Sequence, residues 1–158
     1  LEADGHAEDT VLMLFTDHYC KYFSDAEFIS AIKGETDRNM LSNVPFVIWT
    51  EGIAPQVYDK YVSTMDIAPT VVDLFSLDAD LRYYIGNDMF GPDGGVVYFR
   101  NYAWYDGKTY DTGNDASSNP AVLAMREQAR EQLDVSQDTF RYDYFACLQR
   151  RGILNPDE

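Results

Sequence analysis

Two apolar segments, residues 10–16 and residues 44–50, limit most tightly what this chain can fold into. Neither segment alternates between polar and apolar side chains, and polar residues border both of them. Short uninterrupted runs of this kind are typical of strands that are covered on both faces, as in a parallel sheet. A pattern typical of a helix end at Gly5 precedes the first run. The order of helix, short loop and buried strand is typical of an α/β fold. We therefore predict two or more parallel strands at the edge of an α/β sandwich.

Helical patterns follow each predicted strand. A short helix is expected at residues 25–33, and a second at residues 66–75. In the second helix Asp66 is the expected N-cap, and Pro69 falls in the first turn, where a missing N–H costs little. The apolar side chains expected to line one face of this helix are Ile67, Val71, Leu74 and Phe75.

The character of the chain changes near residue 96. Residues 96–105 are β-prone and aromatic, Asp106 and Gly107 favour a type I′ hairpin turn, and residues 108–111 form the expected returning strand. A helix should then open at Asn119 and Pro120 as N-cap and first residue. A last helix is expected from about residue 136 to residue 151, ending at Gly152. This part of the chain is predicted to be a small antiparallel sheet packed by C-terminal helices.

Composition excludes some function classes. The formal net charge of −15 argues against nucleic acid as a partner, because a phosphate backbone calls for a basic patch. Cys20 and Cys147 are too few and too far apart for a disulfide framework or a zinc site. No apolar run approaches the ~20 residues of a membrane helix, and no signal peptide is present, so a targeting segment would lie outside this chain.

Asp17 and His18 directly follow the first predicted strand, at the sheet edge where α/β proteins place their sites. A carboxylate beside an imidazole suits zinc, manganese or iron. The alternative is an aspartate that caps a turn beside an ordinary histidine. The other histidine, His6, would lie roughly 20 Å away at the opposite strand end and is predicted to be a surface residue. No catalytic nucleophile is evident, because no serine lies in a G-x-S-x-G turn and Cys20 lacks a convincing base.

Tyrosine, phenylalanine and tryptophan crowd residues 98–110. The stretch has two interpretations, a ligand platform or rings that pack a small sheet against a helix.

Three segments in a fixed order resemble the sulfatases and their alkaline phosphatase relatives. Residues 9–18 (DTVLMLFTDH) resemble the segment in which a strand begins with D-T and ends in D-H. Residues 44–49 (VPFVIW) resemble the V-P strand that follows it, and residues 66–75 (DIAPTVVDLF) are similar to the D-I-x-P-T helix.

Within this superfamily the resemblance points to phosphoglycerol transferases of the lipoteichoic acid synthase type. The matching motifs are residues 86–90 (GNDMF), 99–101 (FRN), 107–112 (GKTYDT) and 133–136 (LDVS). This likeness implies a sulfatase-like α/β catalytic domain whose C-terminal portion is residues 1–92, followed by a small α+β subdomain at residues 93–158.

The resemblance also implies a divalent cation, manganese in the first place, with zinc, magnesium and calcium as alternatives. Of the metal ligands that the family uses, only the Asp–His pair has a counterpart in this chain, at Asp17 and His18. The threonine nucleophile, a glutamate ligand and the phosphate-holding residues are expected upstream of Leu1, in a missing N-terminal half with which this chain would pair. The chain would then be an inactive C-terminal fragment of an enzyme that moves glycerol phosphate from a lipid head group to an acceptor, on the extracellular face of a bacterial membrane.

Residues 20–23, after Tyr19, depart from the synthase pattern, which leaves the substrate open. A sulfatase or phosphodiester hydrolase acting on lipid-linked or small phosphate or sulfate esters is one alternative. A non-catalytic module that binds a cell-surface polymer through Tyr102 and Trp104 is another.

Overall fold

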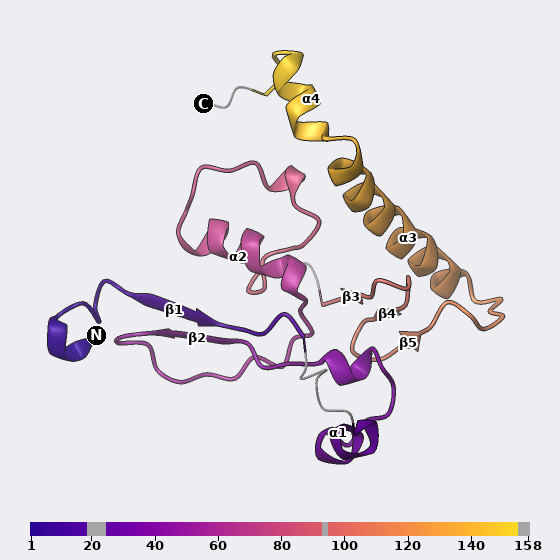
Figure 1. Ribbon diagram of the computed structural model, residues 1–158, viewed down its shortest axis with the longest axis horizontal. Helices are drawn as coiled ribbons and strands as arrows, with labels where there is room; N and C mark the ends of the chain where they lie inside the picture. Colours follow the sequence, from indigo (N-terminus) through magenta and orange to yellow (C-terminus); the bar gives the residue numbers. More distant parts are fainter. Residues whose placement is uncertain (19–24, 93–94, 155–158) are drawn as a thin grey trace. The chain divides into compact units, whose positions relative to one another are not determined.

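The computed structural model describes residues 1–18, 25–92 and 95–154 (Figure 1). The predictions about Cys20 and about the loop at residues 19–23 lie outside this part of the chain. The described chain belongs to two compact units, Leu1–Tyr58 and Asp59–Glu158. This division differs from the boundary expected between residues 92 and 93, and the assignment of residues 1–92 to a catalytic domain stays a prediction. No described helix is long and apolar enough to cross a bilayer.

The first unit is built on a pair of strands, β1 (Val11–Leu14) and β2 (Val47–Thr50). Val11 lies opposite Thr50 and Leu14 opposite Val47, so the strands run antiparallel. The predicted parallel pairing is wrong. Residues 15–46 leave and return at the same end of the pair, where the rings of Phe15 and Phe46 lie 6.3 Å apart. An apolar run carries no information about strand direction, which is why its sequence did not reveal this.

The two faces of this strand pair differ in exposure. Leu12 and Leu14 of β1 are 38% and 58% exposed, and their cross-strand partners Trp49 and Val47 are 37% and 49% exposed. The side chains that alternate with them are half-buried. The prediction of burial on both faces is therefore wrong for this structure, and an apolar sheet face is left open to solvent.

Helix α1 (Ala26–Lys33) confirms the helix predicted at residues 25–33. The Asp25 carboxylate accepts a hydrogen bond from the Phe28 N–H at 3.0 Å, which caps the first turn. At the other end, the Lys33 ammonium donates to the carbonyls of Leu41 and Asn43 at 2.6 and 2.5 Å. These bonds fix the 3-10 turn Met40–Ser42 before β2.

The second unit begins with a 3-10 turn, Thr64–Asp66, that leads into α2 (Ile67–Leu74). The helix lies where the sequence predicted it, but its buried side chains are Pro69, Thr70 and Val72. Of the apolar side chains predicted to share a face, Ile67 and Val71 are half-buried, whereas Leu74 and Phe75 are exposed. Hydrogen bonds to Thr70 turn this polar side of the helix inward.

The small antiparallel sheet is confirmed, with the order β3 (Val97–Tyr98), β4 (Trp104–Tyr105) and β5 (Tyr110–Asp111). Residues 96–105 are not one strand, because Tyr102 adopts φ 64° and its N–H donates to the Phe99 carbonyl at 2.8 Å. This turn folds the segment into a hairpin. The next turn is also longer than predicted, with residues 106–109 between β4 and β5.

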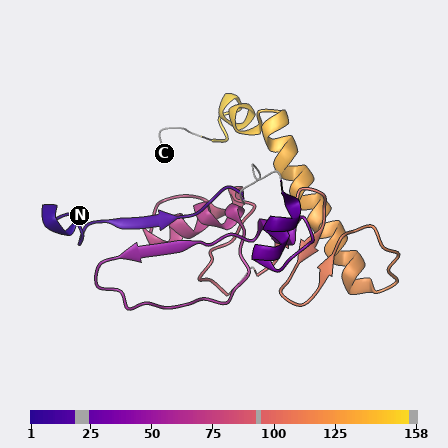
Figure 2. The same cartoon turned by 60° about the horizontal axis from the view of Figure 1, so that its bottom comes forward.

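Helix α3 (Pro120–Arg141) passes beside this sheet and contacts β4 (Figure 2). Asn119 caps it as predicted, accepting from the Ala121 N–H at 3.0 Å. The expected break before residue 136 is wrong, because no glycine or proline interrupts the helix there. The break comes instead at Asp143, with φ 50°, and α4 (Tyr144–Arg150) follows. Gly152, at φ 65°, ends α4 as expected.

Candidate metal centre

Asp17 and His18 follow β1 after two intervening residues. The His18 Nε2 atom is 3.3 Å from the Asp17 Oδ2 atom. The Asp17 side chain is 83% exposed and that of His18 is 32% exposed. The structure therefore brings the two predicted ligands together at an accessible strand end.

The distance between these two atoms fits shared coordination. A charge-assisted N–H···O bond is usually shorter, at about 2.7–2.9 Å. Two donor atoms that each lie about 2.1 Å from one ion are roughly 3.0–3.4 Å apart, for octahedral to tetrahedral angles. The carboxylate and imidazole also match the ligand preferences of manganese, zinc and iron. This spacing and this chemistry would suit two ligands of one ion.

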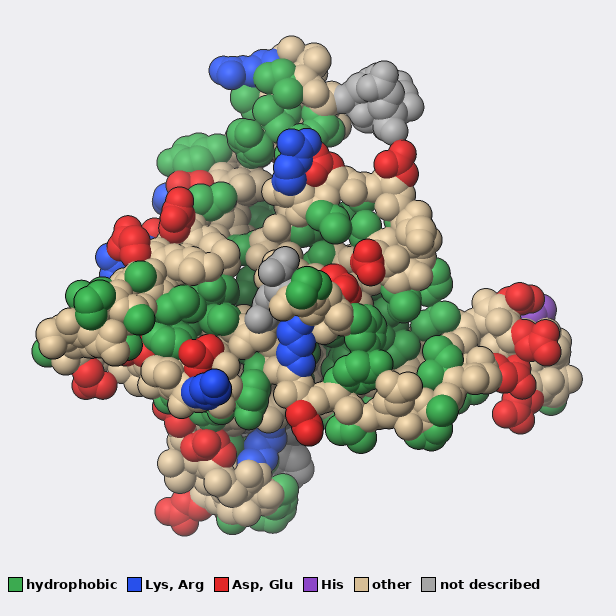
Figure 3. Space-filling model, turned by 180° about the vertical axis from the view of Figure 1, so that it is seen from behind, with side chains coloured by type: hydrophobic (Ala, Val, Ile, Leu, Met, Phe, Trp, Pro, Cys, Tyr) green, Lys and Arg blue, Asp and Glu red, His purple; other side chains and the backbone are tan. Residues whose placement is uncertain are grey.

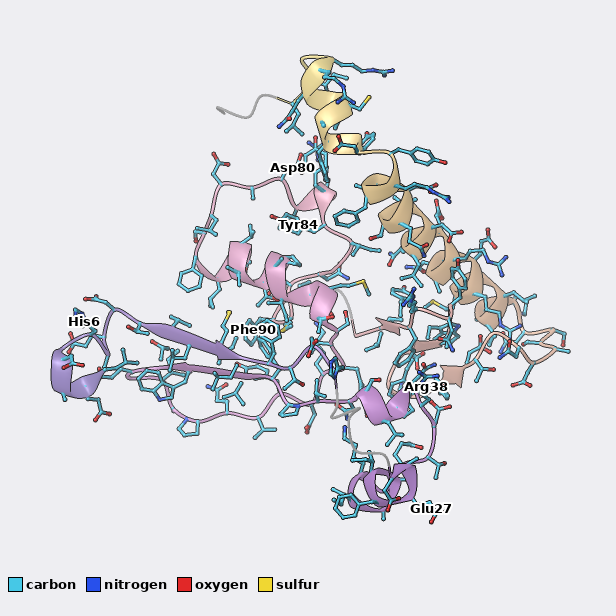
Figure 4. The ribbon with its side chains drawn as sticks, viewed as in Figure 1. His6, Glu27, Arg38, Asp80, Tyr84 and Phe90 are labelled. Atoms are coloured by element: carbon cyan, nitrogen blue, oxygen red, sulfur yellow. The ribbon has the colours of Figure 1, made fainter. Side chains whose placement is uncertain are left out.

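The described residues do not complete such a site. Among them there is no group of three or more histidine, cysteine, aspartate and glutamate side chains placed to hold one ion. His6 precedes β1 near the N-terminus (Figure 4), whereas His18 follows the other end of this strand. Because an ion of this class takes four to six ligands, further donors have to come from outside these residues.

A buried polar network in the second unit was missed by the sequence reasoning. Asp66, 8% exposed, accepts hydrogen bonds from the N–H groups of Ser63 at 2.7 Å and Asn87 at 2.8 Å. The Thr70 hydroxyl, fully buried, donates to the Asp66 carbonyl at 2.6 Å and accepts from the Met89 N–H at 2.8 Å. The DIAPT segment and the GNDMF turn are thus two halves of one clamp.

Gly86 makes this clamp possible. A Cβ atom at this position would lie 2.1 Å from the Met65 carbonyl oxygen, which is backbone and cannot move aside easily. The glycine therefore lets the turn approach close enough for Asn87 and Met89 to reach their acceptors. The sequence contained one signal, namely that the DIAPT segment and the GNDMF turn follow each other as they do in the resembled family. The hydrogen bonds that join the two motifs are visible only in the fold.

A second ion pair joins β5 to α3. The Arg126 guanidinium donates through Nε and Nη2 to the two carboxylate oxygens of Asp111 at 2.7 and 2.6 Å. These bonds hold the pKa of Asp111 below its ordinary value, against the opposing effect of burial. The Trp104 indole also lowers this pKa. Its buried N–H does not form a hydrogen bond of full geometry with any of the described residues. The pair is structural, since it is enclosed between the sheet and the helix.

The aromatic stretch packs the sheet rather than presenting a platform. Trp104 is 2% exposed, and the Tyr102 hydroxyl donates to the Asp134 carboxylate of α3 at 2.8 Å. Tyr105 has edge contacts with Tyr61 and Tyr110 at centroid distances of 4.7 and 6.5 Å. The rings expected to hold a polymer are therefore occupied by contacts within the unit.

Comparison with known proteins agrees with the sequence motifs. The sulfatase family model matches residues 1–77. Lipoteichoic acid synthase 2 of Bacillus subtilis is 23% identical over 175 residues, which covers 100% of this chain and 27% of that protein. Lipoteichoic acid synthases of Staphylococcus saprophyticus and Staphylococcus aureus strain USA300 are each 26% identical, over 99% of this chain and 26% of their own length.

The chain thus spans about a quarter of the length of these relatives. The alignments extend over nearly all residues of this chain, at low identity. The mixed architecture, with small antiparallel sheets and C-terminal helices, agrees with an alkaline phosphatase-like α/β fold. The sulfatase family model covers the segment that holds Asp17, His18 and the whole of α2. Along its whole length the chain is similar to lipoteichoic acid synthases, and its first 77 residues match the sulfatase family model.

Proposed function

We propose that this chain contributes Asp17 and His18 to the divalent-metal site of a sulfatase-superfamily enzyme. The observation that carries the proposal is their accessible position at the end of β1, with 3.3 Å between the donor atoms, inside the segment that matches the sulfatase family. Manganese is the proposed ion, with zinc, magnesium and calcium as alternatives.

The proposed reaction is phosphoglycerol transfer in the synthesis of lipoteichoic acid or a related cell-envelope polymer. It is supported by similarity to lipoteichoic acid synthases along the whole chain. When bound, the metal would lower the pKa of a coordinated hydroxyl and offset charge on phosphoryl oxygens. Asp17 and His18 would hold and orient it, while the nucleophile and the remaining ligands would belong to a longer polypeptide. We place that enzyme at the extracellular face of a bacterial membrane.

The sulfatase match also supports a second reaction class, hydrolysis of sulfate or phosphate esters. Both reactions would use Asp17 and His18 as metal ligands. They would differ in the acceptor of the transferred group, which would be an alcohol for transfer and water for hydrolysis. The polymer-binding module is less well supported, because Trp104 is buried and Tyr102 is hydrogen-bonded to Asp134.

The proposed partner is the remainder of the catalytic domain. Its docking surface would be the apolar face of the strand pair, formed by Leu12, Leu14, Val47 and Trp49. Strands with apolar side chains on both faces are normally covered on both by helices. The relatives have about three times as much chain again from which such a cover could come.

Manganese titration tests the metal pair directly in the 158-residue chain. Even weak Mn²⁺ binding broadens the NMR signals of nearby nuclei, so two ligands are enough for a readout. We expect broadening to begin at the residues around Asp17 and His18 and to be lost in Asp17→Asn/His18→Gln. Glu8→Gln/His6→Gln, which makes the same chemical change at the other end of β1, should leave it intact.

Broadening spread evenly over acidic residues, and equal in both variants, would overturn the metal assignment. The purified chain should also fail to turn over a phosphodiester such as bis(p-nitrophenyl) phosphate. Measurable turnover, absent from Asp17→Asn/His18→Gln, would contradict the need for groups outside the chain.

A further inference from the structure

Large aromatic side chains stand in solvent where α3 meets α4. Phe140 is 84% exposed, Tyr142 67% and Tyr144 47%, and Ile153 just beyond α4 is 64% exposed. Phe140 lies in the last turn of α3 and Tyr144 in the first turn of α4, with Tyr142 and Asp143 between the two helices. Hydrophobic side chains accordingly gather over α4 together with Lys or Arg side chains (Figure 3).

Residues 140–154 carry a charge opposite in sign to that of the chain, although Asp138 precedes them in the last turns of α3. Residues 140–154 contain Arg141, Arg150 and Arg151 but only one acidic residue, Asp143, whereas the whole chain has 27 acidic and 12 basic residues. All three arginines are exposed, and in the described part of the chain none of them forms an ion pair. The Arg141 guanidinium lies 6.0 Å from the centre of the Tyr142 ring, so charge and ring are presented together.

We propose that this α3–α4 corner, defined by Phe140, Arg141, Tyr142, Tyr144, Arg150 and Arg151, docks onto the surface of a lipid bilayer with anionic head groups. Tyrosine and phenylalanine are suited to the boundary between water and acyl chains, because their rings are apolar and the tyrosine hydroxyl stays hydrated. Guanidinium groups bind phosphate oxygens through paired hydrogen bonds. The corner therefore offers both contacts that an anionic bilayer surface accepts.

Two considerations favour a bilayer over a soluble anionic polymer. A charged polymer would satisfy the arginines but would leave Phe140 and Tyr142 in water, whereas a bilayer takes up both kinds of side chain. The acidic remainder of the chain does not forbid the approach, because at physiological salt charges more than about 8 Å from the surface are largely screened. The local charges of the corner then decide the interaction.

Vesicle sedimentation with the full 158-residue chain tests the proposal. Binding is expected to phosphatidylcholine vesicles that contain phosphatidylglycerol, and to be much weaker with phosphatidylcholine alone. Each basic residue near an anionic surface contributes about a fivefold change in affinity, so Arg141→Gln/Arg150→Gln/Arg151→Gln should weaken binding on the order of 100-fold. Phe140→Ser/Tyr142→Ser should weaken binding while leaving its salt dependence in place.

The matched control is Arg38→Gln/Arg100→Gln/Lys108→Gln, which removes the same charge from three exposed positions outside the corner. It should bind like the unmodified chain. Equal binding by the two triple variants would overturn the proposal, and so would a failure of the unmodified chain to bind anionic vesicles. Binding to soluble glycerol phosphate polymer as tight as to vesicles would assign the corner to a polymer instead. None of these outcomes depends on the manganese titration.

Discussion

The paired hydrogen bonds between Arg126 and Asp111 make the stability of the second unit depend on pH. The guanidinium lowers the pKa of Asp111 in the folded chain, so the unfolded chain binds this proton more readily. Its contribution is complete above the ordinary aspartate pKa of about 3.9 and is lost as the pH falls through the lower folded value. Asp111→Asn should reduce the free energy of unfolding by about 3 kcal/mol at pH 7, because it leaves Arg126 half-enclosed without its partner.

Urea denaturation followed by tryptophan fluorescence measures this difference. The gap between Asp111→Asn and the unmodified chain should narrow as the pH is lowered below about 4. Asp80→Asn is the control, because both carboxylate oxygens of Asp80 also accept hydrogen bonds from an arginine, but that arginine, Arg82, is exposed. That variant should change stability little at either pH. A gap for Asp111→Asn that stays constant with pH would show that ionisation of this carboxylate is not involved.

At the scale of elements, the clamp between α2 and the turn at residues 86–89 should govern local stability. Gly86→Ala would place a Cβ atom 2.1 Å from the Met65 carbonyl oxygen and should cost roughly 3 kcal/mol of unfolding free energy. Gly91→Ala is a matched control, since its nearest neighbour is the movable Asp88 carboxylate at 3.0 Å. Thermal unfolding of the two variants compares them. Equal melting temperatures would mean that the turn can move away from α2.

Local physics explains which elements could be predicted from the sequence. The caps at Asp25 and Asn119 depend on hydrogen bonds to residues two or three positions ahead, so a short pattern contains all the information. The clamp was not predictable in this way, because Asp66 binds the backbone of Asn87, 21 residues away. The break at Asp143 was also missed, since a non-glycine residue at φ 50° leaves no compositional mark.

The candidate site also combines features that follow from the local sequence with features that depend on distant parts of the chain. That Asp17 and His18 are neighbours after an apolar strand is a property of the sequence, and the structure adds only their 3.3 Å contact and exposure. The relative direction of β1 and β2, and the solvent exposure of one of their faces, depend on parts of the polypeptide that are distant in sequence from both strands. Apolar periodicity does not encode either property, so the parallel, doubly covered sheet was the wrong prediction for β1 and β2.

At the scale of the whole molecule, the open face of β1 and β2 should make the chain self-associate. Leu14 and Val47 lie directly opposite each other on this face and are 58% and 49% exposed. An apolar strand face without a cover tends to find a second copy when its proper partner is absent. Leu14→Lys/Val47→Glu, which forms a cross-strand charge pair, should shift the chain toward the monomer without disrupting the strands.

Analytical ultracentrifugation over a range of concentrations measures this shift. Ile53→Lys/Val57→Glu is the control, because these side chains are 67% and 89% exposed but lie beyond the strand pair. It should associate like the unmodified chain. If the unmodified chain is monomeric at all concentrations, the face needs no cover, and the proposal that it docks the rest of a catalytic domain loses its physical basis. If only Leu14→Lys/Val47→Glu dissociates, the same surface becomes the place to seek that partner.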